Sequence, residues 1–152
     1  MEKAADYPRP PRLERSTRRV RVVLGGETVV DTTEAWRVLE KGLAPGWYIP
    51  AGAFRPGTLV PTEGSSHCPW KGDARYFDLV AGGRRAGRAA WAYPDPAPAF
   101  APLAGHVALY AGKVDACFID EERVVPQPGG FYGGWVTSEV EGPFKGEPGR
   151  AV

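Results

Sequence analysis

The segment Ser65–Gly72, SSHCPWKG, brings a thiol, an imidazole, an ammonium and an indole together within eight residues. Pro69 restricts the preceding Cys68 to extended geometry and has no N–H of its own, while Gly72 allows the chain to turn. Neighbouring side chains in an extended backbone point to opposite faces, so His67 and Cys68 are not expected to share one pocket. An adjacent Cys–His pair is therefore weak support for a catalytic dyad.

Lys71 is the better partner for Cys68, because it follows three residues later and across a turn. An ammonium beside a thiol stabilises the thiolate, which is the nucleophilic and redox-active form. Cys68 and Lys71 are accordingly the candidate catalytic pair. The alternative is that Cys68 only packs in the interior or lines a pocket.

A second candidate site is an aromatic surface next to this turn. Alternation along the predicted strand 89–93 places Trp91 and Tyr93 on one face and two alanines on the other. If the preceding strand pairs with it, Tyr76 joins this face, and Tyr110 can do so from a later hairpin. Such residues line pockets for flat or cationic ligands, although they are also common in cores. We take these four aromatic residues as candidate ligand-binding residues.

Other kinds of site have less support. Glu40 either reaches the rim of this pocket, which would make it a fifth ligand-binding residue, or is simply exposed to solvent. Zinc needs about four ligands, usually in close pairs, and the Cys and His residues of the chain are only His67, Cys68, His106 and Cys117. The sequence also has no GxSxG motif, no phosphate-binding GxxxxGK[ST] loop and no GxGxxG turn after a strand. We therefore expect no metal site and no cofactor.

Composition indicates one domain with balanced charge. A chain of 152 residues suits a single domain, and 19 Lys and Arg against 18 Asp and Glu give a net charge of +1. This balance offers no electrostatic case for nucleic acid or an anionic membrane as a partner. No apolar run approaches the roughly 18–20 residues that cross a bilayer, and the N-terminus lacks a secretory signal. Two cysteines without a CxxC motif favour reduced thiols and a cytoplasmic location.

The 20 glycines and 16 prolines predict short strands joined by many turns. We predict a mainly β fold of about nine short strands and one helix. The helix is expected to follow N-cap residues at 31–33, to carry apolar residues at helical spacing from Ala35 to Leu39, and to end at Gly42. The main strands are expected at 20–24, 27–31, 47–50, 73–80, 87–93, 106–110, 114–119 and 123–125.

Three regions are expected along the chain. Residues 1–19 form a charged N-terminal arm, residues 20–125 the β domain, and residues 126–152 a C-terminal extension rich in Gly, Pro and aromatic residues. Six arginines between Arg9 and Arg21 make the arm a solvated tail or a partner-binding segment. Disordered tails seldom carry so many aromatic residues, so part of the extension is expected to pack on the domain.

Several stretches resemble one bacterial family, domain of unknown function 427, labelled in places as a nucleotidyltransferase. They cover roughly residues 20–120 and read VRVVLGGETVVDTTEAWRVLEKG, WYIP, HCPWKGDARYF, AWAYPDP and HVALY. The resemblance implies a β-tent, a pair of antiparallel sheets pinned together at one edge. This is also the fold of methionine sulfoxide reductase B and of the drug-binding domain of cereblon.

The resemblance bears on function through what the sequence has and lacks. Many β-tents hold zinc between CxxC pairs, which are missing here, as are the GS motif and paired aspartates of nucleotidyltransferases. Cereblon-like domains hold a small cyclic ligand in an aromatic cage. By analogy of fold, Trp91, Tyr93 and Tyr76 would form a comparable pocket.

Three functional hypotheses follow. The leading one is a domain that binds a small organic ligand in an aromatic-lined pocket, with Glu40, Lys71 and Cys68 at its rim. One alternative is an enzyme that uses Cys68 as nucleophile or redox centre. The other is a protein-interaction module that uses the arginine-rich arm and the C-terminal extension. We expect neither nucleic acid nor a membrane as a partner, and the sequence makes no prediction of oligomeric state.

Overall fold

The computed structural model describes residues 1–147, which form short strands and four single-turn or two-turn 3₁₀ helices. The helices are η1 (Ala4–Asp6), η2 (Ala51–Ala53), η3 (Pro98–Leu103) and η4 (Ala111–Lys113). The strands are β1 (Glu2–Lys3), β2 (Arg12–Arg15), β3 (Val20–Leu24), β4 (Glu27–Thr32), β5 (Trp36–Leu39), β6 (Gly46–Pro50), β7 (Leu59–Cys68), β8 (Gly72–Ala81), β9 (Arg84–Ala92), β10 (His106–Leu109), β11 (Ala116–Ile119), β12 (Glu122–Arg123), β13 (Val125–Pro126), β14 (Trp135–Val136) and β15 (Val140–Glu141).

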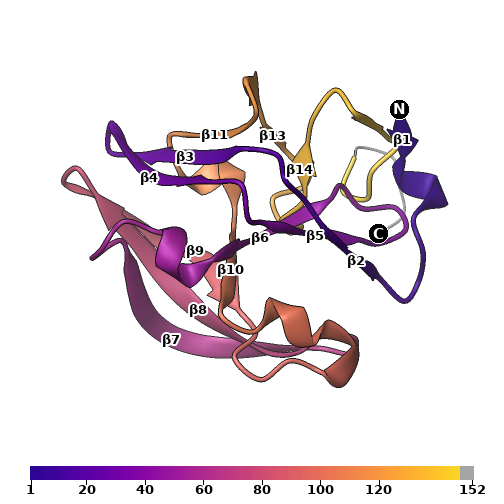
Figure 1. Cartoon of the computed structure of the whole chain (residues 1–152), viewed down its shortest axis with the longest axis horizontal. Coiled ribbons are helices and arrows are strands. Elements are labelled where there is room, and N and C mark those ends of the chain that lie inside the picture. Colours follow the sequence, from indigo (N-terminus) through magenta and orange to yellow (C-terminus); the bar gives the residue numbers. More distant parts are fainter. Residues whose placement is uncertain (148–152) are drawn as a thin grey trace.

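Two antiparallel sheets form the body of the molecule. The larger sheet has seven strands in the order β2-β5-β6-β10-β9-β8-β7, and the smaller has four in the order β12-β11-β3-β4. In Figure 1 the β3, β4 and β11 layer lies above the long strands β7, β8 and β9. Two further pairs, β13-β14 and the parallel pair β1-β15, hold the ends of the chain. The predicted mainly β fold is confirmed.

Side-chain alternation divides the apolar residues of the larger sheet between two cores. In β6, Trp47 and Ile49 point into the core between the two sheets, and Tyr48 points to the other face. That outer face carries a second core, which the η3 segment covers through Phe100 and Leu103. The core between the sheets is completed mainly by small and β-branched residues, among them Val20, Val22, Val30, Ala90 and Val107.

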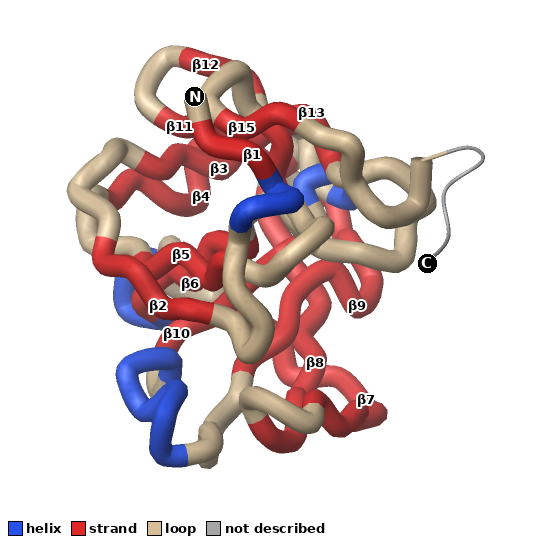
Figure 2. Tube along the Cα trace, turned by 90° about the vertical axis from the view of Figure 1, so that its right-hand side faces the viewer, coloured by secondary structure: helices blue, strands red, loops and turns tan. Residues whose placement is uncertain are grey.

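The helix predicted between residues 31 and 42 is wrong. Residues 36–39 form β5 instead, which pairs with β2 on one side and β6 on the other. Val38 and Leu39 belong to different cores, because both faces of this strand are covered. A strand covered on both faces carries consecutive apolar residues, and these can imitate helical spacing. Figure 2 shows how little of the chain is helical.

Residues 1–19, expected as a charged arm, contribute β1 and β2 to the fold. The buried guanidinium of Arg37 binds the carboxylates of Glu2 and Glu14, and its hydrogen bond holds the pKa of Glu2 below its ordinary value. Arg18 pairs with Glu139 from the distant C-terminal region. Charges that suggested a solvated tail are thus partly neutralised within the chain.

The C-terminal region returns to the core. Trp135 is almost fully buried, stacks on Trp47 with ring centroids 6.3 Å apart, and donates its indole N–H to the carbonyl of Leu109 at 3.1 Å. Of the extension predicted over 126–152, residues 148–152 lie outside the described residues. No helix in residues 1–147 has the length and apolarity needed to cross a membrane.

The pairing of β8 with β9 is interrupted by a bulge next to the site described below. Phe77 pairs with Ala90 and Leu79 with Ala86, so β9 takes four steps where β8 takes two. At the bulge Arg88 has a φ of 48°, which non-glycine residues seldom adopt. The Asp78 carboxylate accepts the backbone N–H of Arg88 at 2.7 Å and thereby holds this conformation. Side chains alternate between the two faces of a strand, so an insertion of two residues leaves the side chains before and after the bulge on the same faces as without it.

Asp78→Asn tests this support. The pKa of Asp78 lies below its ordinary value of 3.8, mainly because the carboxylate accepts the Arg88 N–H and then the Arg85 guanidinium. A lowered pKa contributes stability that is present above the unfolded value and lost as the pH falls through the folded value. The variant should therefore have a lower Tm than the parent near pH 7, and the difference should shrink below about pH 4. Thermal unfolding followed by circular dichroism measures this.

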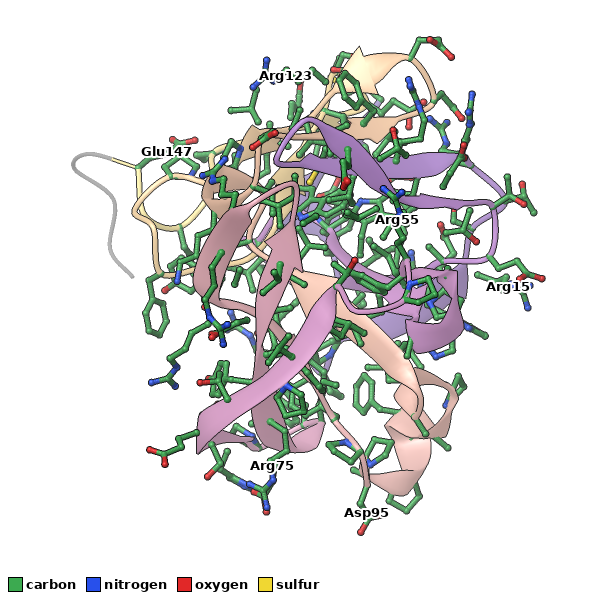
Figure 3. The ribbon with its side chains drawn as sticks, turned by 90° about the vertical axis from the view of Figure 1, so that its left-hand side faces the viewer. Arg15, Arg55, Arg75, Asp95, Arg123 and Glu147 are labelled. Carbon is green, nitrogen blue, oxygen red and sulfur yellow. The ribbon has the colours of Figure 1, made fainter. Side chains whose placement is uncertain are left out.

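The matched control is Asp95→Asn. Asp95 is exposed and, among residues 1–147, forms no ion pair. In Figure 3 it lies at the lower edge of the molecule. Its variant should keep the Tm of the parent at every pH. A Tm difference for Asp78→Asn that did not change with pH would contradict the assigned role of the charge.

Candidate functional site

The register of the larger sheet aligns aromatic residues across its outer face. Tyr76 of β8 lies opposite Trp91 of β9, and Trp91 lies opposite Ala108 of β10. Tyr48 of β6 is the next position across. Because Ala108 is small, the indole N–H of Trp91 reaches over it and donates to the Tyr48 hydroxyl at 3.3 Å. A polar contact therefore bridges the row above the buried Ala108.

Two more tyrosines extend this row. Tyr93, just after β9, has its ring centroid 6.3 Å from that of Tyr48, and Tyr110, just after β10, lies 4.7 Å from the ring of Trp91. The four aromatic residues named from the sequence thus lie on one face. Tyr48 was missed, although alternation along WYIP could have identified it, since Trp47 and Ile49 take the inner face.

A cavity of about 450 Å³ opens over this aromatic face. All seven candidate site residues named from the sequence contribute to its lining: Glu40, Cys68, Lys71, Tyr76, Trp91, Tyr93 and Tyr110. Trp91 is half-buried: it packs against the outer-face core and the Tyr110 ring, and it also borders the cavity. The structure therefore brings both sequence candidates, the thiol–lysine pair and the aromatic face, into one site.

Cys68 and Lys71 lie side by side in the wall of the cavity. The Lys71 ammonium is 3.6 Å from the Cys68 sulfur and 5.8 Å from the centre of the Tyr93 ring. Lys71 is only 8 % exposed, which places it deeper than the rim position expected. His67 also lines the cavity, although alternation predicted that it would not share a pocket with Cys68; its side chain is 70 % exposed, and its Nδ1 lies 2.8 Å from a carboxylate oxygen of Asp73.

The tyrosine hydroxyls of the cavity are hydrogen-bond donors. Burial raises the pKa of Tyr48 and of Tyr93 above the ordinary value, and the neighbouring Tyr48 raises that of Tyr93 further. Burial also raises the pKa of Tyr110. These three side chains therefore stay neutral over the physiological pH range.

Two cations lie against rings of the cavity wall. The guanidinium of Arg88 is 4.4 Å from the centre of the Tyr76 ring, and the ammonium of Lys113 is 4.8 Å from that of Tyr110. Lys113 also donates to the carbonyl of Arg88 at 3.4 Å. The contact of Arg88 with Tyr76 depends on the pairing of β8 with β9, whereas Lys113 follows Tyr110 by only three residues, so local sequence could have suggested the second contact alone. The two cations make the aromatic face positively charged at its margin.

Residues 127–134, here called the strap, cross one edge of the cavity. The buried side chain of Gln127 fixes its start, since it accepts the N–H of Ala44 and donates to the carbonyl of Lys145, both at 2.9 Å. Gly133 lies against Trp91 so closely that an added Cβ would be 2.2 Å from the indole. A glycine is therefore required where the strap rests on the aromatic face.

No group of three or more His, Cys, Asp or Glu side chains that could hold a metal ion is found within residues 1–147. The remaining thiol and imidazole lie elsewhere. Cys117 belongs to the core between the sheets, where burial raises the pKa of its thiol. His106 has its Nδ1 3.0 Å from the carbonyl oxygen of Ala104.

The chain matches the sequence model of a known protein family. The family model described as Domain of unknown function (DUF427) matches residues 12–120. The matched range contains all seven candidate site residues but ends before the strap. No curated protein matches the chain.

Gly133→Ala tests the contact between the strap and Trp91. The new methyl group would overlap the indole, so the strap or the ring must shift, and overpacking of this kind costs about 1–3 kcal/mol of unfolding free energy. Urea denaturation measures the loss. The indole N–H signal of Trp91 in an NMR spectrum, assigned with Trp91→Phe, should move as well.

Gly52→Ala is the control, because a Cβ at Gly52 meets no atom within 4 Å. It should change neither the stability by more than a few tenths of a kcal/mol nor the Trp91 signal. If Gly133→Ala behaved like this control, the strap would not rest on Trp91.

Proposed function

The chain belongs to the family Domain of unknown function (DUF427), and from that premise we propose that it binds a small organic molecule with a flat ring in the aromatic cavity. The observation that carries the proposal is the convergence of aromatic residues from four strands around an open space of about 450 Å³. Small-molecule pockets have volumes of roughly 300–1,000 Å³ and combine apolar walls with a few polar groups.

The shape of the aromatic face supports binding over simple packing. A face that served only as a core would be covered, whereas the half-buried Trp91 borders the cavity. Trp91 borders the cavity and offers ring surface for stacking, whereas Tyr48 is itself buried. The hydroxyls of Tyr48 and Tyr93 supply polar groups beside these rings. A flat molecule with polar substituents matches this arrangement.

Trp91→Ala should abolish binding without unfolding the protein, because it removes the largest stacking surface from a half-buried position. Suitable probes are 2-naphthamide, 2-naphthoate and 2-naphthyltrimethylammonium. At about −0.3 kcal/mol per non-hydrogen atom, such probes should bind with a Kd of roughly 1 mM or tighter. Titration followed by NMR would show signals of the cavity residues moving in the parent chain and not in the variant.

Trp70→Ala is the matched control, because Trp70 is exposed and does not belong to the cavity lining. It should bind the probes as the parent does. Trp91→Phe keeps an aromatic ring and should retain part of the affinity. It therefore tests the role of the ring without the large loss of side-chain volume in Trp91→Ala. If none of the probes moved the cavity signals, or if Trp91→Phe already unfolded the chain, Trp91 would be a core residue and the proposal would fail.

A second candidate function is catalysis by Cys68, which the short distance between its sulfur and the Lys71 ammonium favours. A thiolate is stabilised by a neighbouring positive charge and attacks electrophilic carbon or sulfur. The pair opens onto the same cavity, so a ring-bearing electrophile bound there would lie beside the nucleophile.

Alkylation by iodoacetamide, read out by peptide mass spectrometry, tests this second candidate. In the folded protein Cys68 should react much faster than the buried Cys117, which serves as an internal control. Lys71→Met should slow the reaction of Cys68 several-fold, because it removes the ammonium that lies beside the sulfur. An unchanged rate in Lys71→Met, or reaction of Cys68 only after unfolding, would refute a role as activated nucleophile.

A further inference from the structure

We infer that the ligand of the aromatic cavity carries a carboxylate, and that this carboxylate binds the ammonium of Lys71. The inference rests on the proposed function and names the chemical class of the ligand, a planar ring compound bearing an acid group.

Lys71 is buried without a partner of opposite charge. It is 8 % exposed, and among residues 1–147 it forms no ion pair with a carboxylate. Its one acceptor within this part of the chain is the Cys68 sulfur at 3.6 Å, and sulfur is a weak acceptor. Buried lysines are almost always paired, because an unpaired buried ammonium is costly. A ligand carboxylate would supply the missing partner.

The charges around the cavity favour an anion over a cation. Arg88 and Lys113 lie on the rings of Tyr76 and Tyr110, so positive charge already occupies the aromatic margin. A cationic ligand would be repelled there, and an anionic one attracted. Arg88 and Lys113 lie outside the lining itself; within the part of the lining that the structure describes, Lys71 is the one lysine or arginine and Glu40 the one acid.

The position of Lys71 relates the acid group to the ring. Its ammonium lies 5.8 Å from the centre of the Tyr93 ring, at the edge of the aromatic face. A carboxylate bound there would leave an attached ring free to lie along that face. The neutral hydroxyls of Tyr48 and Tyr93 line the same cavity and can donate to carboxylate oxygens. A flat ring with a directly attached carboxylate therefore fits the donors and the wall together.

Three probes that share the naphthalene ring and differ in the charge of the attached group test the inference: the anionic 2-naphthoate, the neutral 2-naphthamide and the cationic 2-naphthyltrimethylammonium. The parent chain should bind 2-naphthoate most tightly. Lys71→Met, which keeps the length of the side chain and removes its charge, should weaken 2-naphthoate by about 10- to 100-fold, as expected for a hydrogen bond to a charged group. The affinity for 2-naphthamide should change by less than about threefold. Isothermal titration calorimetry measures all three.

Two further variants and one condition make the test independent of misfolding. Lys3→Met removes an exposed ammonium outside the cavity and should bind like the parent. Lys71→Arg keeps the charge and should retain most of the preference for 2-naphthoate. In the unmodified chain, salt should weaken 2-naphthoate and leave 2-naphthamide unaffected, because only the former depends on charge.

The outcomes separate this inference from the proposed function. If 2-naphthamide or the ammonium probe bound at Trp91 as tightly as 2-naphthoate, the carboxylate assignment would be overturned and the binding function would stand. Equal binding of 2-naphthoate by the parent and Lys71→Met would overturn the role of Lys71 in the same way. If none of the three probes bound, both proposals would fail.

Discussion

The register of the seven-stranded antiparallel sheet is the constraint on which the site depends. Because side chains alternate, one register places Tyr48, Tyr76 and Trp91 on the outer face and sends their neighbours into the core between the sheets. A shift by one residue would exchange the two faces and destroy the core and the cavity together. The bulge at Arg88 respects this rule, since it absorbs two residues of β9 and not one. Folding stability and site geometry are thus specified by the same hydrogen-bond pattern.

The charged residues divide into those that stabilise the fold and those that belong to the site. Arg37 is buried but bound by Glu2 and Glu14, so its charge is satisfied within the chain. Lys71 is buried to the same extent without such a pair. Uncompensated burial of charge opposes folding, so the stability of the fold does not account for Lys71, whereas the proposed ligand would. This contrast, more than the presence of aromatic residues alone, makes the cavity a candidate for binding.

Much of the candidate site could be predicted from local sequence, whereas the parts of the fold that were predicted wrongly depend on long-range contacts. The face shared by Trp91, Tyr93, Tyr76 and Tyr110 followed from alternation, which needs no tertiary information. The helix was wrongly predicted at β5 because both faces of this strand are buried. Residues of the aromatic face cover one side, and residues from near the two ends of the chain cover the other. No periodicity rule separates such a strand from a short helix. The partners of residues 1–19 lie up to 138 positions away, as for Glu2 and Val140, which no local pattern reveals.

The cavity also combines parts of the chain that differ in their relation to the family. Its aromatic floor, Cys68 and Lys71 lie within the residues that match the family model, whereas the strap lies beyond them. The strap is nonetheless adapted to the floor, because Gly133 is the residue that allows it to touch Trp91. The proposed ligand would thus meet residues within the family match on the floor and residues beyond that match at the edge formed by the strap.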